Sequence, residues 1–206
     1  MPTELLIIGA SGHAKVVIEA VQADRSTCDI RVTDQDVIKA GKKLLKIFSI
    51  ELLDDWKNLP KQFHVAIGDN NSRRALVELA TEHDKEYVTI VHPDSSVSIT
   101  ASLGEGSFVA ARSVVSAEVL IGDGCIINHG AIVDHDCRIG SYSHIAPNAT
   151  LGGGAVIGEG CMVGAGATIL PQITIGQNSV IGAGAVVTSD IPENQTVMGV
   201  PGKCIK

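Results

Sequence analysis

The feature that most constrains the fold is a repeat of six residues that runs without interruption from Val91 to Val187. Each repeat places a branched aliphatic residue at the same position, and a mostly small residue follows four positions later, as at Ser107, Cys125 and Ala155. We interpret this as a chain that forms a short strand, turns and repeats. The aliphatic side chains would fill a central stack, and the small residues would fit tight corners whose turn dihedral angles suit glycine, Asn and Asp.

The repeat resembles the hexapeptide repeat of left-handed parallel β-helices, and the resemblance covers residues 91 to about 192. In that fold three hexads close one triangular coil, so residues separated by three hexads stack on successive coils at a strand spacing of about 4.8 Å. An aromatic content of 3% and 22 glycines also favour a repetitive architecture over a conventional core. We therefore expect residues 91–206 to form a left-handed β-helix domain with a short C-terminal tail.

Residues 1–90 have a different sequence pattern, which predicts a Rossmann-like α/β domain. The segment ELLIIGASGHAKVVIEAVQAD is an apolar strand, a glycine turn and an amphipathic helix, whose N-terminus can receive a phosphate. The segment FHVAIGDNNSRRALVELATEH repeats this order, with a helix from about Ser72. A short sheet of about four parallel strands should result, with a further strand near DIRVTD.

Charge and cysteine content exclude several classes of protein. A net charge of -7 without a basic stripe argues against nucleic acid or an anionic membrane as the main partner. The apolar run ELLIIGA is too short for a membrane span or a secretory leader, so a cytoplasmic protein without membrane insertion is expected. The five cysteines have no CxxC spacing and should be reduced thiols. Cys125, Cys137 and Cys161 occupy the small corner position, which indicates packed side chains rather than nucleophiles.

The order of motifs along the whole chain resembles one family. A GASGHAK turn, a GDNNSRR turn and a β-helix with His-Asp and Ser-His elements are similar to the bacterial sugar O/N-acyltransferases. Within them the chain is most similar to UDP-4-amino-sugar N-acetyltransferases of the bacillosamine type and to sialic acid O-acetyltransferase relatives. The resemblance implies a homotrimer that uses acetyl-CoA and a nucleotide-linked amino sugar, with active sites between neighbouring β-helices and no required metal.

The resemblance also implies roles for individual residues. It assigns His135 as the general base, Asp136 as the acid that follows it, and His144 as a second histidine near the acetyl thioester. The positions implied to bind the nucleotide sugar are Gly9, Ser11, Gly12, His13, Asp34, Asn70, Arg73 and Asn128. The positions implied to lie along the coenzyme are His144, Gly153, Ala165 and Ala183. One departure is RVTDQD, because the family commonly has an apolar pair followed by Asp-Asp at this place.

The chemistry of acetyl transfer fits these residues independently of the resemblance. Transfer from a thioester to an amine or hydroxyl needs a base near neutral pH, and a carboxylate can fix its tautomer and stabilise the imidazolium. His135 with Asp134 or Asp136 supplies both groups. Gly153 follows His135 by three hexads and should lie beside the base on the next coil. His144 lies half a circuit from His135, so the two should meet only across an interface between subunits.

Two other classes of protein remain as alternatives. Trimeric β-helices of the γ-carbonic anhydrase type bind zinc through interface histidines, for which His129, His135 and His144 are candidates. Their spacings of six and nine differ from a widely separated histidine followed by a close pair. A non-catalytic β-helix would not need a histidine placed between two acids. Within the transferase reading, the sequence leaves open N- or O-acetylation, including a sialic acid acceptor, and the identity of the nucleotide.

Overall fold

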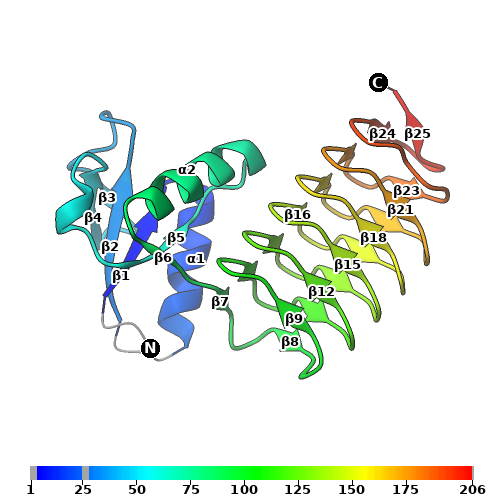
Figure 1. Cartoon of the computed structure of the whole chain (residues 1–206), viewed down its shortest axis with the longest axis horizontal. Coiled ribbons are helices and arrows are strands. Elements are labelled where there is room, and N and C mark those ends of the chain that lie inside the picture. Colours follow the sequence, from blue (N-terminus) through cyan, green and yellow to red (C-terminus); the bar gives the residue numbers. More distant parts are fainter. Residues whose placement is uncertain (1–3, 25–27, 206) are drawn as a thin grey trace. The chain divides into compact units, whose positions relative to one another are not determined.

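The protein separates into two compact units, Met1–Pro93 and Asp94–Lys206, in a computed structural model that describes residues 4–24 and 28–205. The border falls slightly beyond the expected position at residue 90. Figure 1 shows an α/β unit and a coiled stack of short strands, the two fold classes that the sequence predicts. No helix of the described residues is long and apolar enough to cross a membrane.

The first unit is built on a six-stranded sheet with the order β3-β4-β2-β1-β5-β6. Its elements are β1 (Glu4–Ile8), α1 (Gly12–Ala23), β2 (Asp29–Asp34), β3 (Lys43–Leu44), β4 (Phe48–Leu52), the 3-10 helix η1 (Trp56–Asn58), β5 (Gln62–Val65), α2 (Asn70–Glu82), β6 (Glu86–Tyr87) and β7 (Ile90–Val91). All pairs in the sheet are parallel except β3 with β4, which form a hairpin. The segment DIRVTD is the strand β2, as expected, and the hairpin widens the sheet beyond the four strands predicted.

The chain winds outward from the centre of this sheet in both directions. It runs from β1 through α1 to β2 on one side and from β5 through α2 to β6 on the other. Because such crossovers are right-handed, the two helices cover opposite faces, and a ligand crevice is expected where the directions diverge, beyond the ends of β1 and β5. Ile7, Ile18 and Phe63 are fully buried in the core between these layers.

The second unit is a stack of short strands joined by corners, and all of these strands have two residues except β24, which has three. Its strands are β8 (Ser96–Val97), β9 (Ser102–Leu103), β10 (Phe108–Val109), β11 (Val114–Val115), β12 (Leu120–Ile121), β13 (Ile126–Ile127), β14 (Ile132–Val133), β15 (Arg138–Ile139), β16 (His144–Ile145), β17 (Thr150–Leu151), β18 (Val156–Ile157), β19 (Met162–Val163), β20 (Thr168–Ile169), β21 (Thr174–Ile175), β22 (Val180–Ile181), β23 (Val186–Val187), β24 (Thr196–Met198) and β25 (Lys203–Cys204).

From β8 to β23, strands in the stack pair in parallel with the strand that lies three hexads away, which confirms the register predicted from the repeat. Ile127 pairs with Ile145, Ile145 with Val163, and Val163 with Ile181. The second residue of each strand points inward, and these four side chains are completely buried. The aliphatic stack therefore forms one continuous core, and each coil gains its stability from the coils above and below it.

Three flat faces follow from this winding. The first face contains β10, β13, β16, β19 and β22, the second contains β8, β11, β14, β17, β20 and β23, and the third contains β9, β12, β15, β18 and β21. The predicted corner positions hold small buried residues as expected. The thiols of Cys125, Cys137 and Cys161 donate to the carbonyl oxygens of Gly140, Gly152 and Gly176 at 3.1–3.3 Å. Burial raises the pKa of the Cys137 and Cys161 thiols, so both stay protonated.

Candidate active site

His135 stands at the corner between the second and third faces, which we call the His135 corner. It contains Ala117, His135, Gly153 and Pro171, which follow one another at intervals of one full coil. The backbone N–H of Asp136 donates to the Ala117 carbonyl at 3.0 Å, and that of Gly154 donates to the His135 carbonyl at 2.8 Å. These bonds between coils fix the backbone on both sides of the imidazole, so the repeat itself positions the side chain.

The two acids that flank His135 have different tasks. Nδ1 of the imidazole lies 2.7 Å from Oδ2 of Asp136, whereas Oδ1 of Asp134 accepts from the His135 backbone N–H at 2.8 Å. Asp136 reaches this position from a left-handed backbone conformation with φ of 61°. With Nδ1–H donating to this carboxylate, the neutral ring carries its lone pair on Nε2, where it can accept a proton.

These carboxylates also change the basicity of the ring. The hydrogen bond to Asp136 and then the charge of Asp134 raise the pKa of His135 above its ordinary value of 6.5. The side chain is 59% exposed, so solvent and a ligand reach it directly. The corner thus offers an accessible base whose orientation is set by a neighbouring acid.

Gly153 lies directly beside the reactive edge of the imidazole. A Cβ atom built on this glycine would stand 2.6 Å from both Cε1 and Nε2 of His135, closer than non-bonded atoms allow. Gly153 has no left-handed backbone conformation that would demand glycine, in contrast to Gly154 with φ of 70°. The missing side chain therefore keeps space in front of Nε2, as the stacking of residues 135 and 153 predicts.

His144 occupies the first face, away from the His135 corner. It begins β16 between Ile126 and Met162, and its side chain is buried. Nε2 of His144 lies 3.1 Å from Nδ2 of Asn128, which brings together two residues that were expected to belong to different substrates. The half-circuit separation of His135 and His144 agrees with their spacing in the sequence, and one copy of the β-helix does not bring the two rings together.

Ala165 and Ala183 lie at another corner, between the first and second faces. They stack with His129 and Pro147 at intervals of one coil, and both are exposed. The backbone N–H of Gly184 donates to the Ala165 carbonyl at 2.9 Å, which continues the ladder between coils. The four positions expected along the coenzyme are thus divided between two corners and one face of a single chain.

The three histidines of the zinc alternative lie apart within one chain. His129, His135 and His144 occupy one corner, the next corner and the first face, so a single chain does not gather them. In the part of the chain that the structure describes, no three His, Cys, Asp or Glu side chains form a group suited to a metal ion.

In the first unit, the expected nucleotide residues of the first turn surround the end of β1. Gly9 has φ of 107°, and a Cβ atom there would stand 2.8 Å from the Ile67 side chain. Oδ2 of Asp34 accepts from the Ala10 backbone N–H at 2.8 Å and from Nζ of Lys39 at 2.9 Å. Ser11 is the N-cap residue of α1, but its hydroxyl makes no capping bond. His13 follows in the first turn of the same helix.

Asp34 holds this turn in shape through its ionised carboxylate. Burial alone would raise its pKa, but the hydrogen bonds from Lys39 and from the backbone of Asp36 and Ala10 outweigh burial and lower the pKa. Oδ1 accepts from the Asp36 N–H at 2.9 Å, so both oxygens are already engaged. The expected ligand-contacting acid therefore also organises the turn that a ligand would meet.

Arg73 lies inside the second turn rather than on its surface. It is 1% exposed, and its guanidinium donates to the carbonyl oxygens of Ile67 and Gly68 at 3.1 and 3.2 Å and to Oδ1 of Asn70 at 2.9 Å. Asp69 caps α2 by accepting from the Ser72 N–H at 2.8 Å, which starts the helix slightly before the expected Ser72. Arg73 thus fixes the loop, and Asn70 connects it to the start of the helix.

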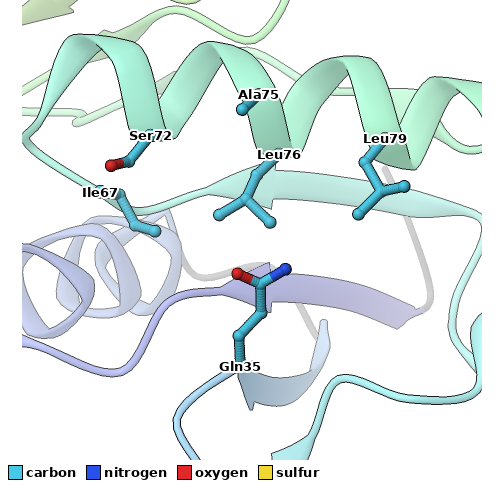
Figure 2. Close-up of a pocket in the computed structure, with 6 residues that line it drawn as sticks. All are labelled: Gln35, Ile67, Ser72, Ala75, Leu76 and Leu79. Carbon is cyan, nitrogen blue, oxygen red and sulfur yellow. The ribbon is translucent and has the colours of Figure 1, made fainter.

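Two cavities open beside these turns, and neither was found from the sequence. One, of about 410 Å³, is lined by Gln35, Ile67, Ser72, Ala75, Leu76 and Leu79. Figure 2 shows the Gln35 carboxamide facing the apolar side chains of α2, with the Ser72 hydroxyl at one end. The other, of about 500 Å³, lies between the first turn and the β3–β4 hairpin. Each cavity combines a helix face with residues from loops or a hairpin, and the sequence pattern does not show which loop meets which helix.

Comparisons with known proteins identify the family. Residues 4–80 match the family model of the PglD N-terminal domain, and residues 118–153 and 154–189 match that of the bacterial transferase hexapeptide. GDP-perosamine N-acetyltransferase of Escherichia coli O157:H7 is 32% identical over 152 residues, which cover 71% of this chain and 69% of that protein. UDP-N-acetylbacillosamine N-acetyltransferase of Bacillus subtilis (strain 168) is 36% identical over 108 residues, covering 51% of this chain and 50% of that protein.

A solved structure extends the likeness over both units. It is a histidine-to-asparagine variant of perosamine N-acetyltransferase from Caulobacter crescentus, in complex with CoA and GDP-perosamine. It is 38% identical, has a TM-score of 0.91, and the match covers 98% of this chain and 97% of that chain. The chain therefore belongs to the family of acetyl-CoA-dependent sugar N-acetyltransferases that join a PglD N-terminal domain to a hexapeptide-repeat β-helix.

Proposed function

We propose that this protein transfers the acetyl group of acetyl-CoA to the amine of a nucleotide-linked 4-amino-4,6-dideoxy sugar, with His135 as the general base. The observation that carries this proposal is the 2.7 Å contact between Nδ1 of His135 and Asp136, which leaves Nε2 free beside Gly153. Relatives that act on GDP-perosamine and on a UDP-linked bacillosamine support the substrate class, and UDP is the nucleotide that the sequence resemblance favours.

The chemistry needs only one proton acceptor from this chain. As the amine nitrogen forms a bond to the acetyl carbonyl carbon, Nε2 of His135 takes the proton that the nitrogen loses. Asp136 stabilises the resulting imidazolium, which then returns the proton to the departing thiolate. The products are the N-acetylated sugar and coenzyme A as a thiol, and no covalent enzyme intermediate is required.

The distribution of the remaining residues supports a site shared between copies of the chain. His135 and Gly153 lie at one corner, Ala165 and Ala183 at another, and His144 on the opposite face. If all of them contact the same pair of substrates, a neighbouring β-helix must bring its Ala165 corner or its first face to the His135 corner. We propose a homotrimer, which is the assembly that the sequence resemblance implies, and sedimentation or light scattering in solution would measure its mass.

The experiment that tests the function measures thiol release from acetyl-CoA with a panel of acceptors. The panel contains UDP- and GDP-linked 4-amino sugars, the same sugars without nucleotide, and sialic acid as the O-acetylation alternative. We expect turnover with a nucleotide-linked amino sugar and much slower turnover with the free sugars. Turnover with sialic acid alone would overturn the proposed acceptor, and absence of turnover with every acceptor would overturn the proposed reaction.

A further inference from the structure

The backbone beside His135 contains three consecutive glycines, Gly152, Gly153 and Gly154, and no other stretch of the sequence has three in a row. Glycine loses more conformational freedom on folding than any other residue, so the chain has little intrinsic preference for one shape at this corner. Yet Gly153 has to stay beside Nε2 of His135 if the space in front of the base is to keep its shape. Contacts from the neighbouring coils must therefore hold these glycines in place.

The coil that follows supplies such contacts through Pro171 and Gln172. A Cβ atom on Gly152 would stand 2.8 Å from Cδ of the Pro171 ring, and one on Gly154 would collide with the carboxamide nitrogen of Gln172. The middle glycine faces the imidazole of His135 from the coil before. The glycine corner is thus packed on both sides, and Gln172 covers its C-terminal end.

Gln172 also bonds to the middle glycine. Its backbone N–H donates to the Gly153 carbonyl at 3.0 Å, and Nε2 of its side chain donates to the same oxygen at 3.3 Å. The first bond belongs to the ladder that joins successive coils, and the second is added to it by the side chain. A carbonyl oxygen has two lone pairs, so both are engaged, and the peptide between Gly153 and Gly154 cannot turn without breaking both bonds.

Gln172 makes this contact from a backbone conformation that glutamine does not favour. Its φ is 63°, a left-handed conformation in which Gly and Asn are the usual residues. Asn178 occupies the same kind of position at another corner, with φ of 56°, and its Oδ1 would stand 2.6 Å from a Cβ atom on Gly160. Asn178 therefore presents an amide oxygen to the glycine of the preceding coil. The longer Gln172 presents a nitrogen, which is the donor that the Gly153 carbonyl needs.

We infer that Gln172 is a positioning residue for the transfer reaction, which holds the Gly153 peptide so that the space beside Nε2 of His135 keeps the shape that the reacting atoms need. The inference rests on the proposed function, because it takes His135 as the base. Gln172 acts through the glycine. A displacement of about 1 Å in a catalytic arrangement can lower a rate about 100-fold, so a loosened Gly153 peptide should lower kcat.

Steady-state kinetics of full-length variants test the inference. Gln172→Met keeps the length of the side chain and removes its donor, whereas Gln172→Gly removes the whole side chain and suits the left-handed backbone. Asn178→Gly is the matched control, because it removes a carboxamide that packs on a glycine at a corner without a histidine. We expect kcat to fall about tenfold in both Gln172 variants, with KM for both substrates within about twofold of the wild type. The control should keep the wild-type kcat.

Two further measurements separate positioning from a purely structural role. Hydrogen–deuterium exchange of residues 149–157 should be faster in both Gln172 variants, because the Gly153 carbonyl loses one of its bonds. The acid limb of the pH profile of kcat/KM should stay in place, since Asp136 and Asp134 set the ionisation of His135. A purely structural role would lower the melting temperature and leave kcat of the folded protein unchanged.

The outcomes separate this inference from the proposed function. If His135→Ala abolishes turnover while both Gln172 variants keep the wild-type kcat, Gln172 is not a positioning residue, although the transferase assignment stands. Equal losses of kcat in Gln172→Gly and Asn178→Gly would indicate general loosening of the β-helix and overturn the inference, as would unchanged hydrogen exchange in both Gln172 variants. If the wild type acetylates no acceptor, the proposed function and this inference fall together.

Discussion

The His135 corner and the first turn of the α/β unit are two candidate functional surfaces built in opposite ways. The corner is a product of the repeat: successive coils fix Ala117, His135 and Gly153 one above another through backbone bonds. The first turn is held by Asp34 at the end of β2, whose carboxylate accepts from the Ala10 N–H at 2.8 Å and from Nζ of Lys39, which leads into the β3–β4 hairpin, at 2.9 Å. The comparison teaches that a periodic scaffold holds a candidate catalytic group by its register, whereas the α/β unit relies on loop geometry and charge.

The largest effect is expected from a break in the aliphatic stack. Ile145 is completely buried between Ile127 and Val163, so Ile145→Ala leaves a cavity and should reduce the free energy of unfolding by about 2–5 kcal/mol. Leu120→Ala is the matched control, because this outward side chain of β12 is 41% exposed. Denaturant unfolding would measure both variants. Equal losses would contradict the alternation of inward and outward residues on which the register rests.

The next effect concerns the space in front of the base. Gly153→Ala would push against the His135 ring, whereas the backbone at this position accepts alanine. We expect kcat to fall about 100-fold, because a small displacement of a catalytic group can have that effect, with little change in the melting temperature. Steady-state kinetics and thermal unfolding measured on the same preparation would check this. A stable variant with wild-type kcat would show that the reaction does not need the space that Gly153 leaves beside Nε2 of His135.

Both of these effects concern features that the repeat in the sequence predicts. The repeat predicted the register, the buried corner cysteines and the closeness of Gly153 to His135, because every coil obeys the same rule. It did not predict the β3–β4 hairpin, since the left-handed Leu45 and Lys46 carry no turn signal. The sequence also did not predict that the Arg73 guanidinium is buried in the loop. Burial of a charged side chain depends on non-local packing, which local patterns do not encode.

A smaller effect is expected from the acid that orients the base. The hydrogen bond to Asp136 is the main cause of the raised pKa of His135, so kcat/KM should rise with pH through a value above 6.5 as Nε2 loses its proton. Asp136→Asn should move this acid limb to lower pH and reduce the maximal rate about tenfold, because the ring loses its orienting partner. A pH profile of kcat/KM for both proteins would test this. An unmoved limb would show that another group controls the ionisation.

The smallest effect is expected at the tip of the β3–β4 hairpin. Leu45 and Lys46 are the two central residues of a turn and both have left-handed backbone conformations, with φ of 50° and 61°. Replacing Leu45 with Asn and Lys46 with Gly introduces the dipeptide that turns with two such residues favour, so the free energy of unfolding should rise by about 0.5–1 kcal/mol. Thermal unfolding would measure the change. An unchanged or lower stability would contradict strain at this turn.

The measurement that tests the central claim most directly compares His135→Ala with His83→Ala on the acceptor that the wild type acetylates. Both histidines are exposed, but His135 has the carboxylate of Asp136 on Nδ1 and a glycine beside Nε2, whereas His83 stacks on Trp56 in the first unit. We predict that kcat falls by about 10²–10⁴ for His135→Ala and stays within a few fold for His83→Ala. Comparable kcat values for His135→Ala and the wild type would contradict the assignment of His135 as the base.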